Sequence, residues 1–130
     1  MPPLAMHRYP MYHCTMYSKE LLRGTLNTLI LQVLKQHGRM YGYEIAQKVK
    51  ELSEERILLK EGSLYPILHK LEAEGHVTVQ DEHIGKRLRR YYVLTETGKT
   101  EAVHQVSELI AFFATVRRFI DPLPDLAFSI

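Results

Sequence analysis

The sequence predicts a mainly α-helical fold with one small β-hairpin, and three observations support this fold class. Apolar residues recur every three or four positions through residues 18–37, 43–52 and 63–74, which is the spacing of one buried helical face. The spacing changes to two over residues 77–95, as is typical of paired strands. From residue 96 to residue 120 it returns to three and four. We therefore expect three helices, a hairpin and a long last helix, in that order.

The composition is that of one folded domain. With 130 residues, 45% apolar and 25% charged, the chain is large enough for a modest core. No apolar run approaches the roughly 20 residues that cross a membrane, and the N-terminus lacks the apolar segment of a signal peptide. Cys14 is the single cysteine, so neither an internal disulfide nor a cysteine metal site is expected. We expect a cytoplasmic protein that binds no membrane, no metal and no cofactor.

An enzymatic function finds no support in the sequence. Seven histidines are scattered along the chain without a His-x-x-x-His pair. There is no phosphate-binding glycine loop and no nucleophile elbow. Cys14 lies in the proline- and methionine-rich stretch at residues 1–16, which has no amphipathic period and is expected to be disordered. We expect a protein that is not an enzyme.

The third predicted helix has one apolar face and one polar face. The apolar face consists of Leu64, Ile67, Leu68 and Leu71. The polar face consists of Ser63, Tyr65, Pro66, His69 and Lys70. These polar side chains can bond to phosphates or base edges. Pro66 is expected in the first turn, where backbone N–H groups have no helical partner, and Gly75 is expected to end the helix. The stretch predicts a DNA-recognition helix.

The elements around this helix predict a helix-turn-helix followed by a wing. A shorter helix over 43–52 precedes it, after a turn at 39–42. A hairpin follows it, with a polar loop at 81–86 and a return strand at 88–95. The net charge is only +2, but four basic side chains gather at the start of the return strand: Lys86, Arg87, Arg89 and Arg90. They would meet phosphates; alternatively, they form a solvated strand face that discourages edge pairing.

The first and last helices carry more apolar surface than a small monomer can bury. A single helix over 18–37, with Leu21 and Leu31 inside and Gly38 at its end, has a broad apolar stripe. In the last helix, capped by Thr95, six apolar residues recur as in a coiled coil: Ala102, Val106, Leu109, Phe113, Val116 and Ile120. Burying each such side chain is worth roughly 1.5–3 kcal/mol. We therefore expect these six residues to form the interface of a homodimer.

Four motifs resemble the PadR family of bacterial transcriptional regulators. They are YGYEI at 41–45, GSLYPIL at 62–68, LEAEG at 71–75 and YYVLTETG at 91–98. The resemblance covers about residues 17–120. It implies a winged-helix homodimer that represses transcription and, in several members, is released by a small, often lipophilic effector near the dimer interface.

The resemblance also implies roles for particular residues. Ser63, Tyr65 and Pro66 would lie against the DNA backbone and major groove, and Lys86 with the nearby arginines would reach the adjacent groove. Tyr41 and Tyr43 would buttress or touch a phosphate. Tyr43 and Tyr65 could instead be packed tyrosines with a bonded hydroxyl. The chain lacks tryptophan, on which small-drug-binding members stack their ligands. This absence favours a DNA binder without an effector.

We expect four regions: a disordered extension at 1–16, a winged-helix DNA-binding domain at 17–95, a dimerisation helix at 96–121 and a loose tail at 122–130. The expected function is a homodimeric repressor whose two recognition helices enter successive major grooves of a near-palindromic operator, roughly 34 Å apart. The alternative is a winged-helix adaptor that binds proteins and no specific DNA. An adaptor has no need of four basic groups in five positions.

Overall fold

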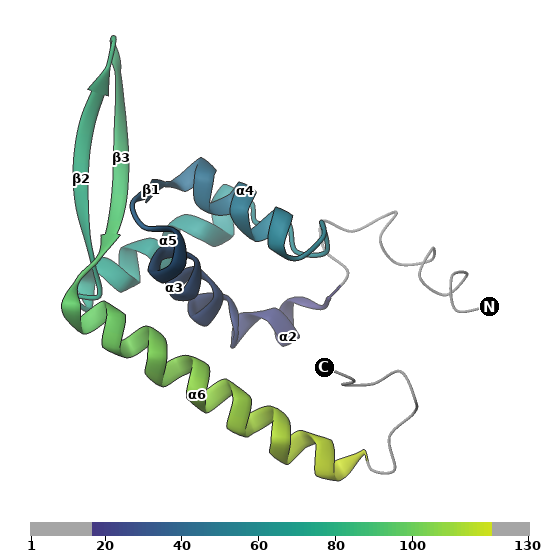
Figure 1. Ribbon diagram of the computed structural model, residues 1–130. Coiled ribbons are helices and arrows are strands. Elements are labelled where there is room, and N and C mark those ends of the chain that lie inside the picture. Colours follow the sequence, from purple (N-terminus) through teal and green to yellow (C-terminus); the bar gives the residue numbers. More distant parts are fainter. Residues whose placement is uncertain (1–16, 121–130) are drawn as a thin grey trace.

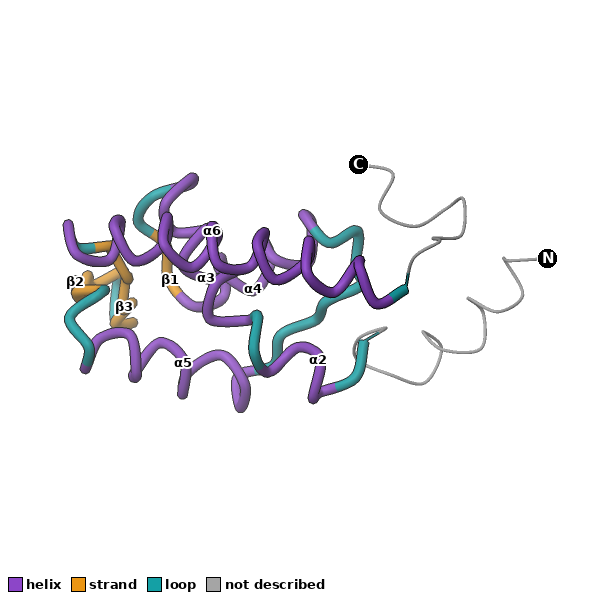
Figure 2. The backbone as a smooth tube through the Cα atoms, turned by 90° about the horizontal axis from the view of Figure 1, so that it is seen from below, coloured by secondary structure: helices purple, strands orange, loops and turns teal. Residues whose placement is uncertain are grey.

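The computed structural model describes residues 17–120, so the predicted extension and tail lie outside the described residues. The described elements, in chain order, are α2 (Lys19–Arg23), α3 (Leu26–His37), β1 (Met40–Tyr41), α4 (Gly42–Leu52), α5 (Glu61–Ala73), β2 (Val77–Ile84), β3 (Arg87–Leu94) and α6 (Glu96–Phe119). The helices form the body, and the β2–β3 hairpin projects from one end of it (Figures 1 and 2). The predicted mainly helical fold with a small hairpin is confirmed.

Helix α3 is the centre of the core. It contacts α4, α6 and β3, and Ile30 and Leu31 on it are completely buried. Leu68 and Leu71 of α5 are also completely buried, as the predicted apolar face requires. The broad apolar stripe of the first predicted helix is therefore covered largely within the chain.

The prediction of one helix over 18–37 is wrong, because α2 ends at Arg23 and α3 begins at Leu26. Gly24 follows α2 as its C-cap, and glycine is a poor helix former. The Thr25 side chain donates to the Leu22 carbonyl at 3.0 Å, a local bond that competes with the helix. Leu21, predicted to point inward, is 64% exposed. Gly38 does end α3, at a φ of 81°.

The sheet has three strands, in the order β1-β3-β2. The predicted turn at 39–42 contains β1, whose Met40 and Tyr41 pair antiparallel with Tyr92 and Tyr91 of β3. The predicted polar loop at 81–86 is mostly strand, because β2 continues to residue 84 and β3 starts at residue 87. Only two residues connect them. Gly85 is the first, with a φ of 64°, which is where a type II′ turn needs glycine.

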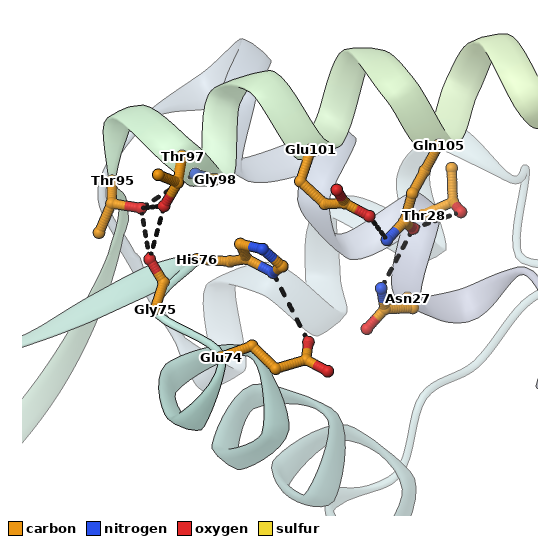
Figure 3. Close-up of polar contacts among 10 residues, drawn as sticks. All are labelled: Asn27, Thr28, Glu74, Gly75, His76, Thr95, Thr97, Gly98, Glu101 and Gln105. Carbon is orange, nitrogen blue, oxygen red and sulfur yellow. Dashed lines mark hydrogen bonds and ion pairs between the residues drawn. The ribbon is translucent and has the colours of Figure 1, made fainter.

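Threonine hydroxyls fasten the start of α6 to the end of α5. Thr95 Oγ1 accepts a hydrogen bond from the Gly98 N–H at 2.9 Å, as the predicted cap requires. Thr95 and Thr97 both donate to the Gly75 carbonyl, at 2.7 and 2.9 Å (Figure 3). A Cβ on Gly98 would collide with the His76 carbonyl group. The end of α5, the base of the β2–β3 hairpin and the start of α6 are thus joined at one corner.

The first turns of α6 pack on α3. Gln105 accepts hydrogen bonds from Asn27 Nδ2 at 3.1 Å and from Thr28 Oγ1 at 2.8 Å (Figure 3). Ala102, one of the six predicted interface residues, is completely buried in the chain's own core. The expectation that nothing in the chain covers this residue is therefore wrong. The other five residues of the set are half-buried or exposed.

Candidate nucleic-acid interface

The outer face of α5 is polar and exposed, as predicted. Ser63, Pro66, His69 and Lys70 are exposed, and Tyr65 is half-buried. The helix begins at residue 61, so Pro66 lies in its second turn and not in the first. A proline there removes the backbone bond that would otherwise reach the carbonyl four residues earlier, which belongs to Gly62.

Tyr65 fixes α5 against the start of α4. Its hydroxyl lies against the Cα of Gly42, and a Cβ on Gly42 would stand only 2.8 Å from Tyr65 Cζ. Gly42 is buried and begins α4, one residue before the predicted start. Tyr65 therefore packs between the two helices of the helix-turn-helix. Only part of its ring remains on the outer face.

The start of α4 presents two tyrosines. The Tyr41 N–H donates to the Glu44 carboxylate at 3.2 Å, which caps the first turn. Tyr43 follows and is 63% exposed. At the other end of α4, Leu52 is 60% exposed.

The four basic residues of the wing do not form one patch. Side chains alternate along β3, so Arg87 and Arg89 share one face and Arg90 lies on the other. Arg90 pairs with Asp81 directly across the hairpin, with Nε 3.1 Å from Oδ1. The hydrogen bond to Asp81 raises the pKa of Arg90. Lys86 lies in the two-residue turn at the wing tip and is exposed.

Arg89 lies on an aromatic row. Its guanidinium carbon is 4.4 Å from the centre of the Tyr41 ring. The Tyr41 ring stacks on Tyr43, with centroids 6.4 Å apart, and meets Tyr91 edge-on at 5.5 Å. The neighbouring Tyr91 side chain raises the pKa of Arg89. The guanidinium carbon of Arg39 lies over the Tyr91 ring, 3.7 Å from its centre.

Two hollows adjoin these residues. The wing hollow, about 520 Å³, is lined by Tyr41, Tyr43, Arg87, Leu88 and Arg89. The helix hollow, about 280 Å³, lies between α4 and α5 and includes Tyr43, Gln47, Lys50, Glu61 and Tyr65 in its lining. Tyr43 belongs to both hollows. Tyr43 therefore joins the linings of the two hollows, and these residues together form the candidate surface.

This surface suits an anionic, partly planar ligand. Arginine guanidinium groups bond to phosphate oxygens in a fixed fork and stack on aromatic rings. The exposed Tyr43 hydroxyl and the half-buried Gln47 amide beside them can bond to phosphates or base edges. Over residues 17–120, no cluster of histidine, cysteine, aspartate or glutamate could hold a metal ion. In the same part of the chain, no helix is long and apolar enough to cross a membrane.

Residues 30–104 match the family model of the transcriptional regulator PadR-like family. This match covers more than half of the chain. The chain belongs to the PadR-like family. Members of this family are DNA-binding transcriptional regulators.

Known proteins resemble this chain in sequence and in structure. An uncharacterized protein, protein X, of Lysinibacillus sphaericus is 31% identical over 109 residues, which are 82% of this chain and 94% of the relative. A transcriptional regulator from Clostridium thermocellum has a similar structure, with a TM-score of 0.73, 26% identity, and coverage of 79% of this chain and 100% of the other. A PadR family regulator from Clostridium difficile gives a TM-score of 0.63, with 30% identity over 74% and 98% of the two chains.

In this PadR-like chain, the structure brings some predicted site residues together and separates others. Tyr41, Tyr43, Arg87 and Arg89 share the wing hollow, whereas Arg90 is paired on the opposite face. Gln47 and Lys50 were missed by sequence reasoning. Gln47 lies four residues after Tyr43, and Lys50 lies three residues after Gln47, so all three are on one side of α4, and this signal could have found them.

Proposed function

We propose that this PadR-like protein is a homodimeric repressor that binds a near-palindromic operator in double-stranded DNA. The observation that carries the proposal is the position of Tyr43 between the two hollows. This position supports a DNA-binding surface that runs from the recognition helix to the basic face of the wing. A DNA duplex presents base edges and phosphates side by side, so a continuous surface can contact both.

Within this surface, α5 reads the bases and the wing holds the backbone. Ser63, Pro66, His69 and Lys70 occupy the exposed face of α5 and would enter the major groove. Lys86, Arg87 and Arg89 would bind phosphates, and Tyr41 and Tyr43 would support Arg89 and touch the backbone. Arg90 has no part in this proposal, because its charge is compensated by Asp81.

The dimer rests on the second half of α6. Exposed apolar residues there are Ile110, Phe112, Phe113, Phe119 and Ile120. Together with the half-buried Val106, Leu109 and Val116, they spread over roughly half of the helix circumference at 3.6 residues per turn. An exposed apolar stripe of this width calls for a partner. A second copy of the chain supplies it and provides the second recognition helix.

An effector would act through the dimer geometry. A small lipophilic ligand that binds better to a dimer with wrongly spaced recognition helices lowers the affinity for the operator. Operator DNA must then lower the affinity for that ligand by the same factor. Titrating candidate ligands with and without operator DNA tests this part of the proposal.

The central test is selection from a random DNA library at two salt concentrations. The wild type is compared with a Lys86/Arg87/Arg89→Ala variant and with Arg90→Ala as the matched control. We expect a two-fold symmetric site, affinity that falls steeply with salt, and a weaker salt dependence only in the triple variant. A reporter gene behind the selected site should then be repressed. If no site is enriched and the triple variant behaves like the wild type, the repressor function is wrong. The protein-binding adaptor is then the remaining alternative.

A further inference from the structure

Arg39 connects all three strands of the sheet. It stands directly before β1, and its guanidinium lies 3.7 Å from the centre of the Tyr91 ring on β3. Its Nη2 is 2.9 Å from Glu82 Oε2 on β2, and its Nε donates to Gln80 Oε1 at 3.1 Å. Arg39 therefore reaches across the middle strand and engages the acidic residue on the far strand.

Glu82 has a second basic neighbour that it does not bind. Arg89 stands directly opposite Glu82 in the strand register. Side chains in such positions are close enough to pair. The next position of the same hairpin shows this pairing, because Arg90 and Asp81 form an ion pair at 3.1 Å. Among the described residues no ion pair joins Arg89 to Glu82, and Arg89 lies on the Tyr41 ring instead.

We infer that Arg39 is a positioning residue that engages Glu82 and thereby keeps Arg89 in the DNA-binding surface. The inference rests on the proposed function, in which Arg89 meets a phosphate. Without Arg39, the Glu82 carboxylate would be the nearest anion across the hairpin from Arg89. Capture by Glu82 would draw the Arg89 charge from the Tyr41 ring toward β2, the outer strand of the wing. Arg39 would thus act on DNA binding without touching DNA.

The salt dependence of DNA binding distinguishes three possible roles of Arg39: positioning Arg89, binding a phosphate directly, and stabilising the fold only. Each phosphate contact contributes about 0.9 to the slope of log affinity against log salt concentration. A residue that positions Arg89 changes this slope only while Glu82 is present. A residue that binds a phosphate itself changes the slope whether or not Glu82 is present, and a purely structural residue leaves it unchanged.

The experiment measures binding of the full chain to a duplex carrying the selected site, between about 50 and 200 mM salt. Arg39→Ala should lower the affinity roughly three- to tenfold at the lower concentration and reduce the slope by about 0.9. Arg39→Ala/Glu82→Gln should restore the wild-type slope. Arg39→Ala/Glu96→Gln has the same net charge, removes a carboxylate of α6 that pairs with Lys99, and should not restore it. A slope that stays low in both double variants, or that never changes, overturns the inference.

A DNA-free measurement keeps the inference separate from the proposed function. A double-mutant cycle of Arg89→Gln and Glu82→Gln on the free energy of unfolding should give no coupling in the wild-type background. In the Arg39→Ala background the same cycle should give favourable coupling. If the wild type selects no DNA site, the proposed function fails while this cycle still decides whether Arg39 keeps Arg89 from Glu82. Equal coupling in the two backgrounds overturns the inference even if the wild type binds DNA.

Discussion

The guanidinium of Arg90 lies 3.1 Å from the carboxylate of Asp81, and this ion pair divides the basic residues of the wing. Arg89, its neighbour in the sequence, lies on the opposite face of β3 and stacks on Tyr41. Adjacent arginines therefore have different surroundings. One faces an acid that compensates its charge, and the other belongs to the surface that is proposed to bind DNA.

We predict that Arg89→Ala and Arg90→Ala affect DNA binding differently. Loss of Arg89 removes one phosphate contact and should reduce the slope of log affinity against log salt by about 0.9. Loss of Arg90 should leave this slope close to that of the wild type, because Arg90 is already paired. Binding to the selected duplex over a salt series gives both slopes. Equal reductions in the two variants would contradict the division of the wing.

Local sequence patterns predicted the elements whose cause is local. The apolar face of α5 depends only on residues three and four apart, and its Leu64, Leu68 and Leu71 are buried as expected. The Thr95 cap depends on a side chain and a backbone N–H three residues on. Such signals lie within one turn of helix, so they can be read without knowing the rest of the fold.

Features that depend on distant partners could not be predicted in this way. Strand β1 has two residues, too few for an alternation, and it exists because Met40 and Tyr41 pair with residues some 50 positions later. Arg90 differs from Arg89 because of what β2 places opposite it. Ala102 fits the spacing of an exposed stripe, but the chain's own core buries it. In each case the deciding contact is tertiary.

Gly98 is predicted to be intolerant of a side chain. An added Cβ would stand 2.9 Å from the His76 carbonyl carbon, which is backbone and cannot rotate away. Gly98→Ala should therefore lower the free energy of unfolding by roughly 1–3 kcal/mol. Gly62→Ala is the matched control, because nothing lies within 4 Å of a Cβ there. It should be neutral or stabilising, and urea unfolding of both variants measures the difference. If Gly98→Ala and Gly62→Ala change the free energy of unfolding equally, the close approach of Gly98 to the His76 carbonyl does not affect stability.

A side chain at Gly42 should clash with Tyr65, and a second substitution, at Tyr65, should relieve the clash. Gly42→Ala places a methyl group against the Tyr65 hydroxyl and should destabilise the chain by roughly 1–3 kcal/mol. Adding Tyr65→Phe removes the nearest atom and should recover part of the loss. Thermal unfolding of the single and double variants tests this coupling. Strict additivity of the two substitutions would mean that these residues do not meet.

Stability should fall at high pH because of Tyr92. This tyrosine is 1% exposed, and burial raises the pKa of its phenol above the ordinary value of about 10. As pH rises through that value, the unfolded chain loses the proton first, so the free energy of unfolding decreases above about pH 10. Urea unfolding over a pH series should show a shallower decrease in Tyr92→Phe. Tyr43→Phe, at an exposed tyrosine, should keep the wild-type decrease.

Substitutions along α6 should separate the chain's own core from the dimer interface. Phe113 is 49% exposed, whereas Ala102 is completely buried in the core. Phe113→Glu should therefore give a folded monomer, because a charge in the apolar stripe blocks only the second copy. Ala102→Glu should unfold the chain, because it buries a carboxylate among apolar side chains. Ser107→Glu, at an exposed position of the same helix, should remain a folded dimer. Sedimentation with circular dichroism distinguishes these outcomes. If Phe113→Glu remains dimeric, the two copies meet through a surface other than the apolar stripe of α6. That other surface would then set the spacing of the two recognition helices.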